Sequence, residues 1–308
     1  MKQRELMENK MNDYLEQFKK YLVSERRMSE NSLQAYCRDV LEYSRFLQEK
    51  NIGRLDEGSN TEVVSFVLKL KNEGKSSATV NRKVASLRAF YNFMAAKGYV
   101  KENPVVNIKS PKIERKELEY LTIEEVDKLL LLPDDSLKGQ RDKAILELMY
   151  ATGIRVSEVI EAKVEDINLR LGFITCNGEH GKARIIPMGR PARAAVENYI
   201  FEIRDKLIKN KDEKNPQEVL FVNYFGEKLT RQGLWKILKE YAEQAGIESK
   251  ITPQTLRNSF AVHMIQNGAD LKSLQELMGH EDITATQIYL SVTKNRIKDV
   301  YDRTHPRA

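Results

Sequence analysis

Apolar residues recur at alternating steps of three and four along the first hundred residues, and this periodicity narrows the possible folds more than any other feature. It marks one face of an amphipathic helix. Segment 32–47 shows it in Leu33, Tyr36, Val40, Tyr43 and Leu47, with Asn31 or Ser32 as a cap. Segment 80–94 repeats it in Val80, Val84, Leu87, Tyr91 and Met94. With further helices expected over 11–22 and 61–70, the sequence predicts a four-helix domain over roughly residues 10 to 100.

The pattern breaks at residues 102–116, which read ENPVVNIKSPKIERK. This segment has two prolines, several cations and no helical stripe, which predicts an extended linker between domains. A chain of 308 residues also exceeds the roughly 100 to 200 residues of a typical domain. We therefore expect an N-terminal helical domain over 1–103, a linker over 104–116 and a second domain over 117–308.

Local signals in the second domain predict helices and one hairpin. Thr122 and Glu125 have the spacing of a capping box. A helix over 140–151 should end at Gly153 and the next should begin near Val156, which places Arg155 in a tight junction. The β-prone runs 172–177 and 183–188 flank a glycine-containing turn and predict a hairpin. With further helices expected over 192–209, 231–245, 254–267 and 271–278, the fold class is mainly α with a small β-sheet.

Positive charge is concentrated in one segment. The net charge is +6, yet residues 71–115 alone hold ten Lys and Arg against three Asp and Glu. Arg82, Lys83 and Arg88 fall off the apolar stripe of their helix, so we expect them to face outward as DNA-binding residues. An anionic membrane surface, or merely a solvated face, would also suit such a segment.

Several classes of protein are disfavoured. Cys37 and Cys176 lie far apart without a CxxC spacing, so neither a disulfide framework nor a zinc site is indicated. The N-terminus has no hydrophobic signal region and no apolar run reaches the ~18 residues that span a bilayer, so we expect a cytoplasmic protein without membrane contact. Walker A, GxGxxG, HExxH and GxSxG motifs are absent, and no metal or other cofactor is expected.

The remaining polar residues suit phosphoryl transfer. Attack on a phosphodiester builds negative charge on its oxygens, and arginine binds such oxygens bidentately and stays protonated. Arg155 and Arg257 each lie at or near the start of a helix, while His280 and Tyr289 offer a proton acceptor and a nucleophile. Taken singly, each has an ordinary explanation as an ion-pair member, a cap or a core residue. Their joint occurrence favours a catalytic site for phosphoryl transfer.

At these residues the chain resembles the tyrosine recombinases, most closely the bacterial XerC/XerD group and nearer to XerD. The resemblance runs through Tyr-Ala-Thr-Gly-Ile-Arg-Val-Ser-Glu158, Asn-Gly-Ala-Asp270, Leu-Met-Gly-His280, Thr-Gln-Ile-Tyr289 and the closing His-Pro-Arg-Ala308. It implies a helical core-binding (SAM-like) domain and a catalytic domain that close as a C-shaped clamp on duplex DNA. It also implies that Arg155 and Arg257 bind the scissile phosphate, His280 assists, Tyr289 forms a 3′-phosphotyrosyl bond, and Glu158 orients its neighbours.

Three positions depart from the family pattern. Glu179 stands where a lysine usually acts as general acid, and a carboxylate is ionised at neutral pH and repels phosphate. Lys182 lies in the same turn and is the candidate replacement. Gln254 stands at the usual His or Lys position, three residues before Arg257, and Asn258 replaces the histidine that commonly follows this arginine. These changes leave two hypotheses open, an active recombinase or a catalytically impaired homologue that binds DNA as a partner. A helical DNA-binding regulator is a third.

The resemblance also implies partners. The substrate would be a dif-like or att-like site in double-stranded DNA, used in chromosome dimer resolution at cell division or in the integration of a mobile element. The protein would act as a homo- or hetero-tetramer joined by the tail from Ser291 to Tyr301, whose apolar residues are too few for a stable isolated helix. A sister Xer recombinase and a DNA translocase of the FtsK type are the expected protein partners.

Overall fold

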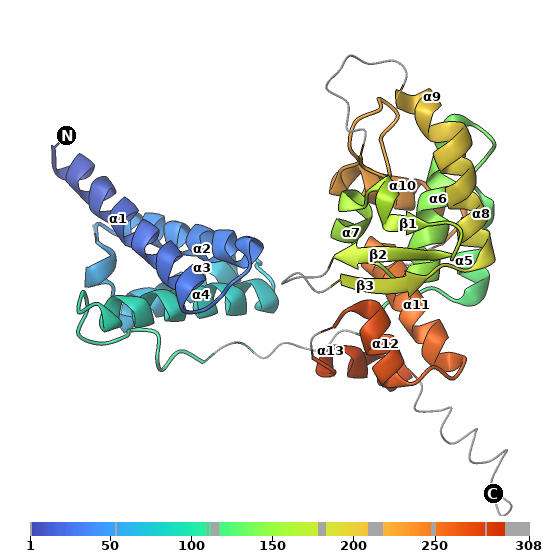
Figure 1. The fold of residues 1–308 in the computed structure, drawn as a ribbon. Helices are drawn as coiled ribbons and strands as arrows, with labels where there is room; N and C mark the ends of the chain where they lie inside the picture. The colour runs from blue at the N-terminus through green and yellow to red at the C-terminus, as the bar shows by residue number, and fades with distance from the viewer. Residues whose placement is uncertain are drawn as a thin grey trace, which may run out of the picture. The chain divides into compact units, whose positions relative to one another are not determined.

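The structure, a computed structural model, consists of two compact units, residues 1–116 and 117–308 (Figure 1). It describes residues 2–52, 54–109, 111, 117–177, 183–208, 218–247, 251–280 and 282–292. Glu179, Lys182 and the tail beyond residue 292 lie outside these ranges. None of the described helices is long and apolar enough to cross a membrane.

The first unit is a bundle of the four predicted helices, each longer than its apolar stripe. They are α1 (Lys2–Ser24), α2 (Glu30–Glu49), α3 (Asn60–Asn72) and α4 (Ser77–Ala96), with a 3-10 turn at Leu55–Glu57. The stripe residues form its core, which is rich in aromatic rings, among them Phe18, Tyr43, Phe66, Phe90, Tyr91 and Phe93. Residues 104–107 form a turn, and Val105 and Ile108 are buried in this core. That part of the expected linker is therefore not extended, because two of its apolar side chains pack into the core of the first unit.

Helix α4 does not place all three predicted DNA-binding cations on an open face. Arg82 is exposed and bonds to Asp39 of α2, and Arg88 donates to the carbonyl of Ile108 at 2.9 Å. Lys83 is only 5% exposed and lies 3.3 Å from Asp39 and 2.5 Å from Glu42. The prediction for Lys83 is corrected on this point: its charge pairs with Asp39 inside the bundle, where an unpaired carboxylate would be costly, and with Glu42 at the surface.

The second unit confirms the mainly helical fold with a small sheet. Its first helices are α5 (Ile123–Leu131), capped by the predicted Thr122 and Glu125 box, α6 (Leu137–Thr152) and α7 (Val156–Glu161). After a 3-10 turn at Val164–Asp166, strands β1 (Ile167–Asn168), β2 (Phe173–Asn177) and β3 (Ala183–Pro187) form an antiparallel sheet in sequence order. The register pairs Ile174 with Ile186, both buried.

Helices complete the second unit. They are α8 (Arg190–Asn198), a π-helical turn (Tyr199–Ile203), α9 (Arg204–Ile208), α10 (Arg231–Gln244), α11 (Pro253–Gln266), α12 (Leu271–Met278), α13 (Thr284–Gln287) and a 3-10 turn (Ile288–Val292). Figure 1 shows α12 and α13 close to α11 at the end of the unit below strand β3. The short strand β1 and the π-helical turn were not predicted. They carry no sequence signal of their own, because β1 has two residues and the turn continues an apolar helical stripe.

Two glycines in left-handed conformation shape the region where α6, α11 and α12 meet. Gly153 (φ 57°) ends α6, and a Cβ there would lie 2.2 Å from the ring of Phe260 on α11. Gly279 (φ 62°) ends α12. Both combine a positive φ with a close neighbour, so glycine is required.

Candidate active site

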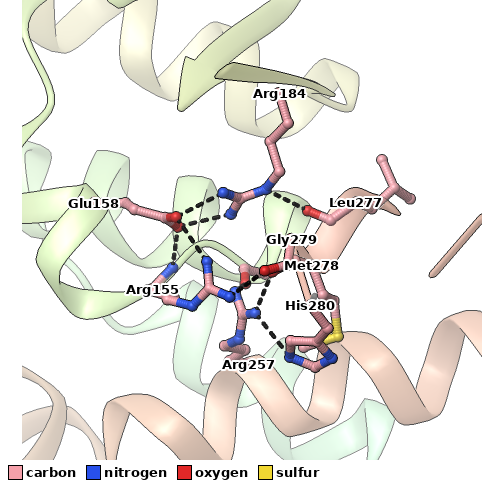
Figure 2. Close-up of polar contacts among 9 residues, drawn as sticks. Arg155, Glu158, Arg184, Arg257, Leu277, Met278, Gly279 and His280 are labelled. Carbon is pink, nitrogen blue, oxygen red and sulfur yellow. Dashed lines mark hydrogen bonds and ion pairs between the residues drawn. The ribbon is translucent and has the colours of Figure 1, made fainter. Parts of the chain in front are cut away.

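Three arginines from three different elements converge on the C-terminal end of α12. Arg184 donates to the carbonyl of Leu277 at 2.8 Å, Arg257 donates to that of Met278 at 2.6 Å, and Arg155 donates to that of Gly279. Figure 2 shows the guanidinium groups gathered around this turn. The last carbonyls of a helix have no partner within the helix and carry its negative dipole end, so they stabilise cations. The turn is a scaffold that orders the arginines.

Arg155 is held at the junction that the sequence predicted. It is the N-cap of α7, and its backbone N–H donates to Glu158 at 2.7 Å while its side chain donates to the same carboxylate at 3.0 Å. Burial alone would raise the pKa of Glu158, but hydrogen bonds from Arg184 and Arg155 outweigh it, and the pKa of Glu158 is lowered. Glu158 therefore remains a carboxylate at neutral pH and fixes the Arg155 side chain, which is 36% exposed.

Arg257 is the most enclosed of the three arginines, with 3% of the residue exposed. It also donates to the carbonyl of Gly153, so it joins the end of α6 to the end of α12. Burial, and then the nearby charge of Arg155, lower the pKa of Arg257 to about 10. At neutral pH it is still protonated, and its buried charge together with the more exposed charge of Arg155 forms a site that attracts an anion.

His280 follows Gly279 and contacts the arginine cluster through one ring nitrogen. Its Nε2 lies 3.2 Å from Nη2 of Arg257, and its Nδ1 lies 2.9 Å from Oγ1 of Thr286. A guanidinium only donates, so Nε2 is the acceptor and the proton of the neutral ring sits on Nδ1, facing Thr286. Burial, and then the charges of Arg257 and Arg155, lower the pKa of His280 to about 4. The ring is therefore neutral at pH 7.

Tyr289 is buried in the 3-10 turn after α13, beside the arginine cluster. Its hydroxyl donates to Oδ1 of Asn258 at 3.2 Å, and Gln254 donates to the same oxygen at 2.9 Å. Asn258 in turn donates to the carbonyl of Glu119 at 2.9 Å. Burial raises the pKa of Tyr289, and the charge of Arg257 opposes this effect. The hydroxyl is thus neutral and held by an amide.

Of the predicted site residues, Arg155 and Arg257 both bond to the turn that ends α12, and His280 follows this turn and contacts Arg257. Tyr289 and Gln254 both bond to Asn258, the residue after Arg257. Glu179 and Lys182 lie outside the described residues. Sequence reasoning did not name Arg184, although a signal existed. Arg184 shares the inward face of β3 with buried Ile186, two positions on, and an arginine there needs a partner.

Comparison with known proteins gives two family matches. Residues 119–296 match the phage integrase family, and residues 15–98 match the phage integrase N-terminal SAM-like domain. The tyrosine recombinase XerD of Oceanobacillus iheyensis is 44% identical over 96% of this chain and 98% of its own length. The XerD of Listeria monocytogenes serotype 4b is 43% identical over 97% of this chain and its whole length.

Solved structures share the fold. The XerH site-specific recombinase bound to a palindromic difH substrate, in a post-cleavage complex, superposes with a TM-score of 0.73 at 21% identity and covers 93% of this chain and 83% of its own. A lambda integrase dimer bound to a COC′ core site superposes with a TM-score of 0.69 at 19% identity and covers 90% of this chain and 94% of its own. The predicted combination of a SAM-like helical domain and a catalytic domain is confirmed.

Proposed function

Because this chain belongs to the phage integrase family and is a site-specific tyrosine recombinase of the Xer type, we propose that Arg155, Arg257, His280 and Tyr289 form its active site. The substrate is double-stranded DNA. The alternative of a catalytically impaired DNA-binding homologue is not favoured, since relatives at 44% and 43% identity bear the name tyrosine recombinase.

Tyr289 supplies the nucleophile. Its Oη attacks the phosphorus of one DNA strand, a phosphotyrosyl bond forms on the 3′ side, and the 5′-oxygen leaves with a proton. The covalent bond retains the phosphodiester energy, so the reverse attack by a 5′-hydroxyl rejoins DNA without ATP. In the present structure the hydroxyl is bonded to Asn258. It therefore has to exchange this acceptor for the phosphate before it attacks.

Arg155 and Arg257 hold the non-bridging oxygens. A guanidinium has five N–H donors, and the contacts with Glu158 and Gly279 engage two of those of Arg155, so others can turn to a phosphate. Because both groups are fixed before DNA arrives, they stabilise the charge that develops in the transition state. The single observation that carries this assignment is their shared anchorage at the end of α12.

His280 takes part as a neutral base or hydrogen-bond acceptor. Its Nε2 lone pair faces Arg257 and the ring is neutral at pH 7. A neutral imidazole can accept the proton that Tyr289 loses on attack. Gln254 contributes a neutral amide donor, which bonds to Asn258, at the position where the family resemblance implies His or Lys. Lys182 is the candidate general acid in place of Glu179.

The test is covalent trapping on a nicked suicide substrate, from which the cleaved fragment diffuses away. Tyr289→Phe should lose all covalent product and keep its DNA affinity, since only the attacking oxygen is removed. The matched control is Tyr150→Phe, which also removes a hydroxyl from the second unit, one that bonds to His263 at 3.0 Å. Covalent product with Tyr289→Phe, or its loss with Tyr150→Phe, overturns the assignment of the nucleophile.

The organisation of the chain and its biological setting belong to the same proposal. Residues 1–103 bind DNA, 104–116 connect, and 117–308 carry catalysis. Two names support the setting: XerD for the relatives and difH for the site bound by a protein of the same fold. We infer a dif-like or att-like site, a tetramer on DNA assembled through the tail from Ser291 to Tyr301, and partnership with a sister Xer recombinase and an FtsK-type translocase.

A further inference from the structure

A third arginine, outside the set assigned to the phosphate, ties the active site together. Arg184 extends from β3 and forms a two-pronged ion pair with Glu158, at 2.6 Å and 2.7 Å, while its Nε donates to the carbonyl of Leu277 at 2.8 Å (Figure 2). Its side chain is only 12% exposed. Forked arginine–carboxylate pairs have a fixed geometry, which a point charge cannot impose.

The guanidinium of Arg184 also packs against the backbone of the turn. A Cβ built on Gly279 would lie 2.9 Å from Cζ of Arg184 and 3.0 Å from its Nε. The planar group therefore lies against the Cα of Gly279, whose carbonyl accepts from Arg155 and whose next residue is His280. Arg184 thus bonds to Glu158, which holds Arg155, and to the turn that precedes His280. It acts on Arg155 and His280 through these two neighbours.

We propose that Arg184 is a positioning residue, which sets the orientation of Arg155 and of the 277–280 turn for phosphate binding. The inference rests on the proposed function. Glu158 accepts from Arg184 at both of its oxygens, and the guanidinium of Arg155 shares one of them, Oε1. When Arg184 is removed, the carboxylate has one cation left, Arg155, and draws the donors of Arg155 away from the DNA. The turn loses an anchor at the same time, and a displacement of about 1 Å in a reacting group can cost ~10²-fold in rate.

The experiment compares Arg184→Met, which keeps the bulk without the charge, with Arg184→Lys. Single-turnover cleavage of the nicked suicide substrate should fall about 10²-fold with Met, and DNA affinity should stay within a few-fold. Lysine should restore part of the rate, because it pairs at one point but cannot form the fork. Cleavage at the wild-type rate with Met overturns the proposal.

The matched control is Arg204→Met. Arg204 is another buried arginine of the second unit that donates to backbone carbonyls, those of Val219 and Leu220. Its loss should lower the melting temperature but leave the cleavage rate of the folded protein unchanged. An equal loss of rate in both variants would mean that Arg184 acts only through general stability.

Two further measurements separate positioning from other roles. In the double variant Arg184→Met, Arg155→Ala, the combined loss of rate should be smaller than the product of the two single losses, because part of the effect of Arg184 acts through Arg155; fully multiplied effects would overturn the proposal. A substrate with sulfur as the 5′ leaving atom should leave the defect of Arg184→Met in place, and rescue would instead assign Arg184 to leaving-group protonation. Failure of the proposed function itself shows separately, as covalent product with Tyr289→Phe.

Discussion

Oη of Tyr289, in the 3-10 turn after α13, lies 3.2 Å from Oδ1 of Asn258, which follows Arg257 on α11. The amide holds the hydroxyl next to the arginine cluster and away from solvent. Asn258 is itself fixed by Gln254 and by the carbonyl of Glu119. Thus two positions that depart from the usual family residues, 254 and 258, together support the tyrosine.

This relationship predicts coupled stabilities. Tyr289→Phe should lower the free energy of unfolding by about 1 kcal/mol, the usual net value of one hydrogen bond. In an Asn258→Leu background, Tyr289→Phe should leave the free energy of unfolding unchanged or raise it, because the buried hydroxyl has already lost the amide acceptor at position 258. Urea unfolding of the four proteins completes the cycle. Equal costs in both backgrounds would show that the bond contributes nothing.

His280 should stay neutral well below the ordinary histidine pKa. Its pKa in the folded protein is about 4, against an ordinary value of 6.5. Between these values the unfolded chain binds a proton that the folded chain does not, so the free energy of unfolding falls as the pH drops from 6.5 toward 4. Above pH 6.5 there is no contribution. NMR titration of the imidazole should show no midpoint near pH 6.5, and His280→Gln should unfold with a weaker acid dependence.

Arg82 and Lys83, neighbours on α4, should differ in their effects on DNA binding and on stability. Arg82→Ala should weaken binding to any DNA and reduce the slope of log K against log salt by about 0.9, the value for one lost phosphate contact. Lys83→Met should leave that slope unchanged and lower the melting temperature, because Asp39 and Glu42 lose a cation partner although Asp39 keeps Arg82. The salt dependence of DNA affinity and the melting temperature of each variant separate the two. An unchanged slope with Arg82→Ala would make that arginine a structural residue.

Glu179 should limit the chemical step. A general acid contributes about 10² to 10⁴ in rate, and a glutamate with its usual pKa near 4.3 cannot donate a proton at pH 7. Glu179→Lys should therefore raise the cleavage rate on ordinary duplex DNA by roughly 10². A 5′-sulfur substrate should nearly erase the difference. If wild type is already as fast as the variant, and Lys182→Ala abolishes cleavage, Lys182 is the acid.

The tail should matter for assembly rather than for binding one site. Truncation after Thr293 removes Ile297, Val300 and Tyr301, an apolar set that needs another surface to pack on. The truncated protein should bind a single half-site normally and lose cooperative pairing and synapsis. Gel-shift titration on one and two half-sites tests this. Undiminished cooperativity would place the contact elsewhere.

How far the sequence predicts this molecule depends on the range of each interaction. The end of α6 at Gly153 and the junction that holds Arg155 follow from signals within a few residues, and the structure confirms both. The bonds of Arg184 join residues 26 and 93 positions apart, to Glu158 and Leu277, and no local pattern encodes such pairs. The burial of Lys83 likewise depends on where α2 packs.

The anchorage of three guanidiniums on the carbonyls of Leu277, Met278 and Gly279 has a consequence for the entropy of DNA binding. An arginine side chain that becomes ordered loses about 2 kcal/mol of rotamer freedom. Here much of this loss occurs when the chain folds, so Arg155 and Arg257 lose less rotamer freedom when they bind the phosphate. Calorimetry of a variant with a loosened 277–280 turn should accordingly show binding that is weaker through a less favourable entropy.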